Sequence, residues 1–352
     1  MTIYDLLQKL VDQKGSDIHL MVGSAPVMRV DGALVIDPEL PILDEKAAES
    51  LIMPLLSKDQ QIFLQKNKEI DFGYQFGDKG RFRVNIYHAL GKIAAALRLI
   101  PPRIKTIEEL GLPTLLHEFT KFNQGLVLLT GPTGEGKSTT LAALINEINT
   151  TRSEHIITIE DPVEFVHTPK KSIISHREVN QDTLDWQIAL KSALREDPNV
   201  VLVGEMRDYE TIAATLTLAE TGHLVFATLH TSTAAQTIDR IIDVFPSAQQ
   251  SQIRQQIASS LRAVVAQRLV PKISGGRAAA FEIMVVNDAV RNLIRESKTF
   301  QLDNVLQTSS DAGMILIENY LFEMISQGII TRETAIATAF RPKEIERILN
   351  QA

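Results

Sequence analysis

The pattern of apolar and polar residues separates an amino-terminal part with short elements from a longer part in which apolar strands alternate with helices. From residue 125 onward, several segments are almost entirely apolar, as strands buried on both faces must be. The expected strands are residues 126–130, 156–160, 200–203 and 224–228, and the expected helices between them are 138–149, 183–195 and 209–220. This alternation predicts an α/β fold with a parallel, doubly wound sheet that binds ligands at the carboxyl ends of its strands.

The first hundred residues contain one helical pattern and several short strand-like segments, which predict a small α+β domain. Apolar residues share one helical face over residues 3–13 and alternate with polar residues over 80–87. Further expected strands are 17–20, 27–30 (followed by a turn at Asp31 and Gly32) and 94–100. Pro101 and Pro102 then prevent a helix and mark a candidate boundary. After about Pro271 the pattern is largely helical, with expected helices at 287–296, 311–327 and 331–350.

The composition is that of an ordinary globular chain, with 44% hydrophobic and 22% charged residues among 352. Cysteine is absent from the sequence, which excludes disulfide bonds, cysteine-based zinc sites and thiol nucleophiles and suits a reducing cytoplasm. The amino terminus lacks the pattern of a signal peptide, and no apolar run approaches the roughly 20 residues of a membrane span. The net charge of −7 makes binding to nucleic acid an unfavoured expectation.

Residues 131–138 match the phosphate-binding pattern G-x-x-x-x-G-K-[ST] at every fixed position, between an expected strand and an expected helix. Backbone N–H groups of such a glycine-rich loop surround phosphates, and the partial positive charge of the helix N-terminus adds to their attraction. Lys137 is expected to contact the β- and γ-phosphates, and the Ser138 hydroxyl to ligate Mg²⁺. The predicted nucleotide-binding residues are Gly131, Pro132, Thr133, Gly134, Glu135, Gly136, Lys137, Ser138 and Thr139. The sequence therefore predicts a site for a nucleoside triphosphate.

Acidic residues follow two of the expected strands, where nucleotide-site residues of such sheets are found. Glu160, Asp161 and Glu164 follow one strand, and Glu205 follows another. These are candidates for a metal ligand and for a group that orients water in phosphoryl transfer. The alternative is that they are acids in solvated loops. Gly204 stands where many phosphate-loop enzymes carry a metal-ligating aspartate, so Glu205 alone would serve that strand.

Histidines and arginines supply further candidates. His223 and His230 flank the expected strand 224–228, either as structural residues or as sensors of the γ-phosphate. Arg81, Arg83 and Arg98 lie in the first domain, either on a solvated strand face or as arginines that stabilise transition-state charge against another domain or subunit.

The motifs resemble those of secretion-type ring ATPases of the type IV pilus and type II secretion superfamily. The segments that carry the likeness are 15–20, the phosphate loop at 131–139, the acidic box at 159–165, Gly204 to Asp208, and the histidine box from Thr221 to His230. Within that superfamily the chain is most similar to pilus retraction (twitching-motility, PilT-type) ATPases. Residues 289–296, AVRNLIRE, resemble the retraction signature AIRNLIRE, and the tetracysteine zinc module common in assembly and secretion relatives is absent from the sequence.

The resemblance implies an organisation and a set of residue roles. It implies a PAS-like N-terminal domain at 1–100, a linker at 101–115, a RecA-like ATPase core at 116–270 and a helical C-terminal part of the motor domain at 271–352. Among the implied catalytic residues, Glu164 polarises the attacking water, and Glu205 is the Walker B acid, which ligates Mg²⁺ together with Ser138. Arg83 and Arg98 match arginines that approach the γ-phosphate, and His223 and His230 are implied sensors of nucleotide state. Which of Glu164 and Glu205 is the general base stays open at this stage.

The resemblance also implies that a hexamer hydrolyses ATP at the cytoplasmic face of the inner membrane and drives pilus retraction through a membrane platform protein. A second retraction ATPase is a further candidate partner, membrane association would occur only through the platform protein, and nucleic acid is not an expected partner. The alternatives are a pilus-assembly or type II secretion ATPase, an accessory nucleotide-binding ring, and a RecA-like nucleic-acid motor. Glu135 replaces the serine usual at its position, and a carboxylate there should weaken triphosphate binding unless it points to solvent or meets a cation.

Overall fold

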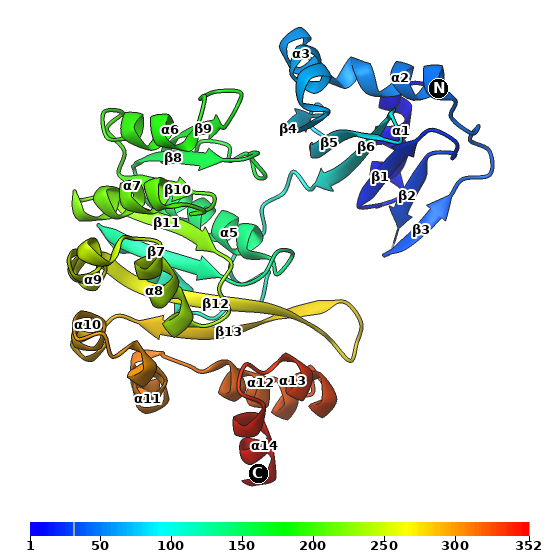
Figure 1. Cartoon of the computed structure of the whole chain (residues 1–352). Helices are drawn as coiled ribbons and strands as arrows, with labels where there is room; N and C mark the ends of the chain where they lie inside the picture. Colours follow the sequence, from blue (N-terminus) through cyan, green and yellow to red (C-terminus); the bar gives the residue numbers. More distant parts are fainter. Residues whose placement is uncertain (31, 352) are drawn as a thin grey trace. The chain divides into compact units, whose positions relative to one another are not determined.

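The computed structural model describes residues 1–30 and 32–351, which form two compact units (Figure 1). The first unit comprises Met1–Arg103 together with Asp161–Val166, and the second comprises Ile104–Glu160 and the chain from His167 onward. The acidic box is therefore divided, because Glu160 belongs to the second unit and Glu164 to the first.

The first unit is an antiparallel sheet with helices packed on one face. Its strands lie in the order β3-β2-β1-β6-β5-β4. Their bounds are β1 (Asp17–Met21), β2 (Val27–Val30), β3 (Ala33–Ile36), β4 (Glu69–Gln75), β5 (Arg81–Ala89) and β6 (Lys92–Ile100). The helices are α1 (Ile3–Asp12), α2 (Glu45–Ile52), the 3-10 helix η1 (Met53–Leu55) and α3 (Lys58–Asn67). Capping boxes at Thr2 and Ser57 start α1 and α3 by satisfying N–H groups of the first turn.

The alternation predicted over residues 80–87 is present in β5. Phe82, Val84 and Ile86 are fully buried in the core beneath the helices. Arg81 and Arg83 lie on the opposite, half-buried face. The predicted helix at 3–13 and the strands at 17–20, 27–30 and 94–100 are also present, whereas the predicted turn at Asp31 and Gly32 includes Asp31, which lies outside the described residues.

The second unit contains a doubly wound sheet with strand order β13-β12-β7-β11-β10-β8-β9. The strands are β7 (Gly125–Thr130), β8 (His155–Glu160), β9 (Ile173–Glu178), β10 (Val200–Val203), β11 (Leu224–Leu229), β12 (Leu261–Pro271) and β13 (Arg277–Val285). Neighbouring strands from β12 to β9 are parallel, and β13 is antiparallel to β12. The helices up to β12 are α4 (Leu116–Phe119), α5 (Lys137–Thr151), α6 (Trp186–Ala193), α7 (Tyr209–Glu220), α8 (Ala234–Asp243) and α9 (Ser247–Ser260).

Both faces of this sheet are covered, which explains why its central strands are apolar throughout. In β7, Leu126 and Leu128 belong to one core with helices α6 to α9, while Val127 and Leu129 belong to another core with α4 and α5. The predicted α/β class and the four predicted strands of this sheet are confirmed.

The prediction of a parallel sheet and of a largely helical segment after Pro271 did not include one strand, β13. The long β12–β13 hairpin (yellow in Figure 1) adds an antiparallel edge, and β13 lies within the segment 271–352. Alanines at 278–280 have weak strand propensity, so the pattern of β13 resembled neither template strongly. Strand β9 was missed for another reason, because it is a polar edge strand of sequence IISHRE.

Helices follow the hairpin and pack beside it, as Figure 1 shows in orange and red. They are α10 (Asp288–Arg295), η2 (Thr299–Gln301), α11 (Leu302–Thr308), η3 (Ser310–Ala312), α12 (Ile317–Ser326), α13 (Arg332–Thr338) and α14 (Pro342–Gln351). An apolar cluster joins α12, α13 and α14 to Val270 of β12 and Ala280 of β13. None of the helices in the described part of the chain is long and apolar enough to cross a membrane.

A cluster of charged side chains adds to the contacts between the hairpin and the C-terminal helices. Arg341, directly before α14, contacts the buried Glu282 of β13 and Glu318 of α12 at 2.9 and 2.8 Å, and Asp303 of α11 at 2.8 Å. Glu282 also accepts the N–H of Ala234 at the start of α8. Burial raises the pKa of Glu282 although Arg341 lowers it in part. Burial would lower the pKa of Arg341, but the bond to Asp303 and the charges of Glu282 and Glu318 raise it. One guanidinium therefore connects β13, α12 and α11 to the segment that leads into α14.

Candidate active site

The phosphate loop connects β7 to α5 and has the backbone geometry of an anion cradle. Gly131 has a φ of 137°, and a Cβ atom there would lie 2.4 Å from the carbonyl oxygen of Gln267. Glycine is therefore required at this position for both conformation and space. Helix α5 begins at Lys137 without a side-chain cap, so its first turn presents N–H groups to the loop.

Lys137 points back into this loop. Its buried ammonium donates hydrogen bonds to the carbonyl oxygens of Gly131 at 2.6 Å and Pro132 at 2.9 Å. Ser138 and Thr139 follow in the first turn of α5, where they are half-buried, and Thr133 and Gly134 are exposed. A cation enclosed by a glycine loop at a helix N-terminus fits the phosphates of a nucleotide.

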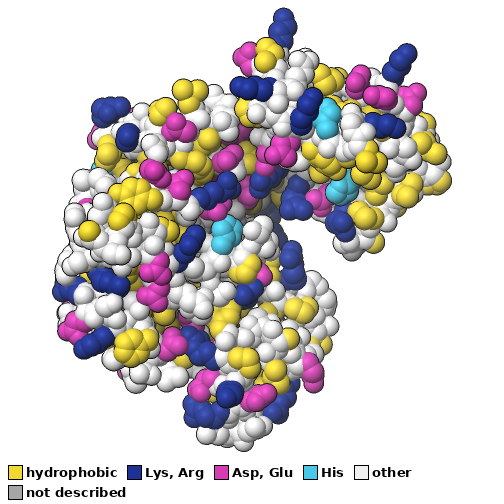
Figure 2. Space-filling model, in the orientation of Figure 1, with side chains coloured by type: hydrophobic (Ala, Val, Ile, Leu, Met, Phe, Trp, Pro, Cys, Tyr) yellow, Lys and Arg dark blue, Asp and Glu magenta, His cyan; other side chains and the backbone are white. Residues whose placement is uncertain are grey.

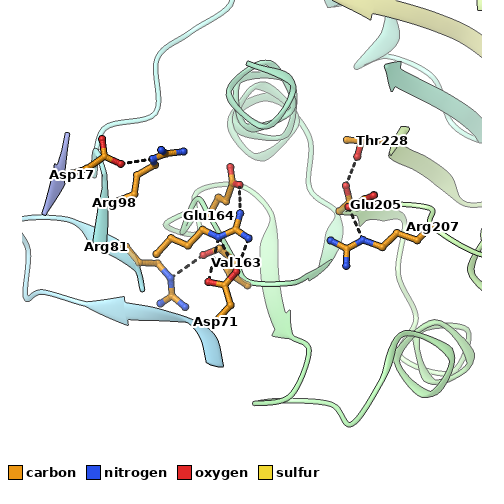
Figure 3. Close-up of polar contacts among 11 residues, drawn as sticks. Asp17, Asp71, Arg81, Arg98, Val163, Glu164, Glu205, Arg207 and Thr228 are labelled. Atoms are coloured by element: carbon orange, nitrogen blue, oxygen red, sulfur yellow. Dashed lines mark hydrogen bonds and ion pairs between the residues drawn. The ribbon is translucent and has the colours of Figure 1, made fainter. Parts of the chain in front are cut away.

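Glu205 follows β10 and is held between two basic side chains. Its Oε1 accepts from Nε2 of His230 at 2.9 Å, and its Oε2 accepts from Nε of Arg207 at 2.8 Å. Figure 3 shows Arg207 directed at Glu205, with Thr228 of β11 beside them. Thr228 donates to the carbonyl oxygen of Gly204 and accepts the N–H of Met206, which fixes the backbone on both sides of Glu205.

The packing of neighbouring strands accounts for Gly204. A Cβ atom at this position would lie 3.2 Å from the carbonyl oxygen of Ile159 and 3.3 Å from the Cα atom of Glu160. A side chain in the place of the usual aspartate would therefore crowd the end of β8. This leaves Glu205 as the carboxylate that β10 contributes.

The two predicted histidine sensors lie at opposite ends of β11. His230 follows the strand at its carboxyl end and contacts Glu205. His223 precedes it, and its Nδ1 contacts Thr221 and the carbonyl oxygen of Leu218. Seven residues of extended chain separate the two by about 23 Å. The structure therefore places His230 with Glu205 and places His223 elsewhere in this unit.

The first unit holds a second cluster of predicted residues. Arg83 of β5 forms an ion pair with Asp71 of β4 at 2.6 Å and lies 3.7 Å from Oε1 of Glu164. The hydrogen bond to Asp71 raises the pKa of Arg83, with smaller contributions from the charges of Glu164 and Asp161. Its neighbour on the same face, Arg81, donates to the carbonyl oxygen of Val163 at 2.9 Å (Figure 3). The strand therefore holds residues 163–164 by two arginines.

Arg98 of β6 lies opposite Arg83 in the sheet register. Its side chain is 71% exposed and forms an ion pair with Asp17 of β1 at 2.8 Å, as drawn in Figure 3. Burial would raise the pKa of Asp17, but hydrogen bonds from Ser16 and Arg98 lower it below its usual value. Arg98 is thus anchored at one nitrogen while most of its side chain faces solvent.

The predicted Mg²⁺ ligands are Ser138 and Glu205. Among the described residues, no group of three or more histidine and carboxylate side chains forms a metal site by itself. A hydroxyl in the first turn after a phosphate loop and one carboxylate nevertheless fit Mg²⁺, which commonly takes few protein ligands and completes its shell with phosphate oxygens and water.

Sequence reasoning missed the partners that orient the predicted residues. Asp71, Asp17 and Arg207 each bind one of them directly. Arg207 had a visible signal, because it lies two residues from Glu205. Asp17 lies in the segment 15–20 that carries the resemblance, but its contact with Arg98 depends on the pairing of β1 with β6. Asp71 had no such signal, because only the pairing of β4 with β5 brings it near Arg83.

The fold and the phosphate loop define a nucleotide-binding motor of the RecA-like class, and the chain belongs to the type II/IV secretion system protein family, whose model matches residues 2–275. It is 46% identical to the type IV pilus retraction ATPase PilT of Pseudomonas aeruginosa over 343 residues, or 97% of this chain and 99% of that protein. It is 45% identical to a twitching motility protein of Neisseria gonorrhoeae, covering 95% of this chain and 89% of that protein.

A solved structure of the pilus retraction motor PilT with bound ADP is 44% identical and superposes with a TM-score of 0.92 over 99% of both chains. Within the family the chain is a PilT-type retraction ATPase. The resemblance drawn from the sequence motifs and the predicted ATPase activity are therefore confirmed.

Proposed function

We propose that this ATPase works as a hexameric ring at the cytoplasmic face of the inner membrane and drives retraction of a type IV pilus. The observation that carries the proposal is the placement of a complete phosphate loop and the Glu205–His230 pair at the ends of β7, β10 and β11. Near full-length similarity to PilT supports the cellular role.

The residues of the second unit take distinct roles in this proposal. The loop from Gly131 to Thr139 binds ATP, with Lys137 exchanging its contacts with loop carbonyls for contacts with phosphate oxygens. Ser138 and Glu205 would hold Mg²⁺, which would neutralise charge on the phosphates when bound. His230 reports nucleotide state to Glu205 through their contact at 2.9 Å.

Residues of the first unit supply water activation and positive charge. Glu164 polarises the attacking water, and Arg83, which lies 3.7 Å from it, brings positive charge to the γ-phosphate. Arg98 has the exposure needed for the same task. We assign no role to His223 within its own chain, because it lies at the opposite end of β11 from Glu205.

The mechanical part of the proposal concerns partners. A head-to-tail ring closes when the rotation between subunits closes, which suits a motor that works in sequence around its axis. Such a ring would act on an inner-membrane platform protein, alone or with a second retraction ATPase, and would associate with the membrane only through the platform protein. Charged side chains of both signs are interspersed on the face drawn in Figure 2, and the net charge of −7 is consistent with a protein partner rather than nucleic acid.

The test is a count of surface pili and a twitching assay in the native host carrying Lys137→Ala at the chromosomal locus. Retraction predicts more pili than in the wild type and loss of twitching. A cell without pili would show that the chain belongs to pilus assembly instead. Unchanged pili and twitching would remove the chain from both roles.

A further inference from the structure

Glu135 lies within the phosphate loop, yet its carboxylate is bound to the neighbouring strand β12. The backbone N–H of Leu269 donates to its Oε2, and Arg268 lies 3.4 Å from its Oε1. Gln267 adds a contact by donating from Nε2 to the backbone carbonyl of Glu135 at 2.7 Å. Only 19% of the Glu135 side chain is exposed, so the carboxylate meets a cation instead of solvent.

The sheet register explains why β12 offers these groups. Strand β7 ends at Thr130, which pairs with Ala266, while β12 continues to Pro271. Beyond Ala266, no strand in the described part of the chain pairs with the edge of β12 that faced β7. Leu269 is half-buried at this edge, and an N–H shielded from water costs free energy when it lacks an acceptor, so an acceptor from the loop stabilises the edge. Glu135 provides that acceptor for Leu269.

Arg268 extends this contact to two other segments. Its second terminal nitrogen lies 3.4 Å from Oγ of Ser232, which follows His230 by two residues. Its guanidinium carbon lies 5.3 Å from the ring centre of Phe340, the residue before Arg341. The arginine therefore touches the phosphate loop, the segment after His230 and the connection between α13 and α14.

We propose that Glu135 is a positioning residue for nucleotide binding, and that Glu135, Arg268 and Leu269 form a clasp that holds the phosphate loop against β12. The clasp directs the negative charge of Glu135 away from the phosphates and joins the loop to the segment that follows His230. This inference rests on the proposed role of the loop in binding ATP.

The clasp, and the alternative in which Glu135 faces the phosphates, predict opposite changes in nucleotide affinity when the carboxylate is removed. A carboxylate that faced the phosphates would repel them, so its removal would tighten nucleotide binding. If the carboxylate instead holds the loop in its binding conformation, its removal must weaken nucleotide binding, because ordering the loop then costs free energy when nucleotide binds.

The experiment measures ADP binding to the full chain by calorimetry, with steady-state ATP hydrolysis alongside. Glu135→Gln retains an acceptor for Leu269 but loses attraction to Arg268, and we expect it to raise the Kd of ADP about threefold. Glu135→Ala removes both contacts, and we expect about a tenfold rise, in line with loss of a charge-assisted hydrogen bond. KM for ATP should rise more than kcat falls, because bound nucleotide restores the loop.

Two further variants separate the clasp from a general loss of charge or of folding. Arg268→Gln should weaken ADP binding by itself but should add little to Glu135→Ala, because both changes open the same contact. Glu118→Gln removes a carboxylate whose partner is Lys121 on the surface, and should leave the Kd unchanged. Thermal unfolding without nucleotide identifies variants that have lost their fold.

Tighter or unchanged ADP binding in folded Glu135→Gln and Glu135→Ala would overturn the clasp. Full additivity of Glu135→Ala with Arg268→Gln would also overturn it. Lys137→Ala distinguishes this failure from failure of the site itself. If Lys137→Ala still binds ADP normally, the proposed role of the loop is wrong; if it loses binding while the Glu135 variants are normal, only the clasp is wrong.

Discussion

Nε2 of His230 lies 2.9 Å from Oε1 of Glu205, although 25 residues separate them in the chain. The parallel pairing of β10 with β11 produces this contact, because it brings the carboxyl ends of the two strands to one edge of the sheet. A carboxylate so held has a defined orientation, which a carboxylate in a free loop lacks.

Changes at this pair should lower the rate of hydrolysis more than they affect binding. We expect Glu205→Gln to reduce kcat about 10²-fold or more and His230→Ala to reduce it about tenfold, while KM for ATP changes little. Phosphate release at saturating ATP measures both. The control is His88→Ala, which changes a half-buried histidine of β5 that contacts the backbone of Lys68. Equal kcat in His230→Ala and the control would contradict the role of the contact.

The arginine cluster predicts that substitutions in the first unit reduce kcat to different extents. Arg83→Ala should reduce kcat about 10³-fold if Arg83 stabilises transition-state charge, with nucleotide affinity largely retained. Asp71→Asn should have a smaller effect, because it only releases the arginine from its 2.6 Å ion pair.

Mixed rings test whether Arg83 acts across a subunit boundary. Subunits carrying Arg83→Ala and subunits carrying Glu164→Gln are combined before hydrolysis is measured. Activity above that of either variant alone indicates that one intact site is assembled from two subunits. An absence of rescue would place both residues in the same site of one chain, since Arg83 lies 3.7 Å from Glu164.

The glycines of the phosphate loop allow a matched comparison. Gly131 and Gly134 both have positive φ, at 137° and 85°, but an added Cβ atom at Gly131 would lie 2.4 Å from the carbonyl oxygen of Gln267, whereas it would meet nothing within 4 Å at Gly134. Gly134→Ala should cost only the strain of the backbone, about 1–2 kcal/mol. Gly131→Ala should cost a further ~1–3 kcal/mol through the clash. Urea unfolding measures the difference, and equal losses would contradict the close approach.

The Arg341 cluster makes stability depend on pH in a defined direction. Burial raises the pKa of Glu282 above the usual 4.5. A carboxyl whose pKa is higher in the folded state binds its proton more tightly there, so its contribution to stability is present below pH 4.5 and is lost as pH rises through the folded pKa.

Arg341→Met removes the cation that partly offsets this effect. We expect it to lower the free energy of unfolding by about 3–5 kcal/mol, because Glu282 and Glu318 are left buried without their cation. The loss should be larger at pH 8 than at pH 5. Arg347→Met, on helix α14 that follows Arg341, removes an exposed pair with Glu344 and a contact with Gln351, and should change stability little. Equal losses in the two variants, or a larger loss at pH 5, would contradict the account.

Sequence reasoning found what depends on local pattern and missed what depends on pairing. The strands β7, β8, β10 and β11 were predictable because burial on both faces makes them apolar throughout. The fixed spacing of the phosphate loop likewise identified Lys137. In contrast, the hairpin of β12 and β13 carries polar and alanine residues at positions that only the neighbouring chain explains.

The orientation of Glu135 shows the same limit. Its spacing places it in the phosphate loop, where a carboxylate is expected to weaken triphosphate binding unless it points to solvent or meets a cation. The partners that change this interpretation, Arg268 and Leu269, lie more than 130 residues later in the chain. No local pattern could have revealed that contact, because it arises from β12 extending beyond the end of β7.

The most direct test of the central claim is ATP turnover by the full chain with Mg²⁺, compared with Lys137→Ala. The account predicts steady phosphate release by the wild type and loss of both nucleotide binding and turnover in the variant, with the fold retained. Near wild-type hydrolysis by Lys137→Ala would contradict the assignment of the loop from Gly131 to Ser138 as the site of ATP hydrolysis.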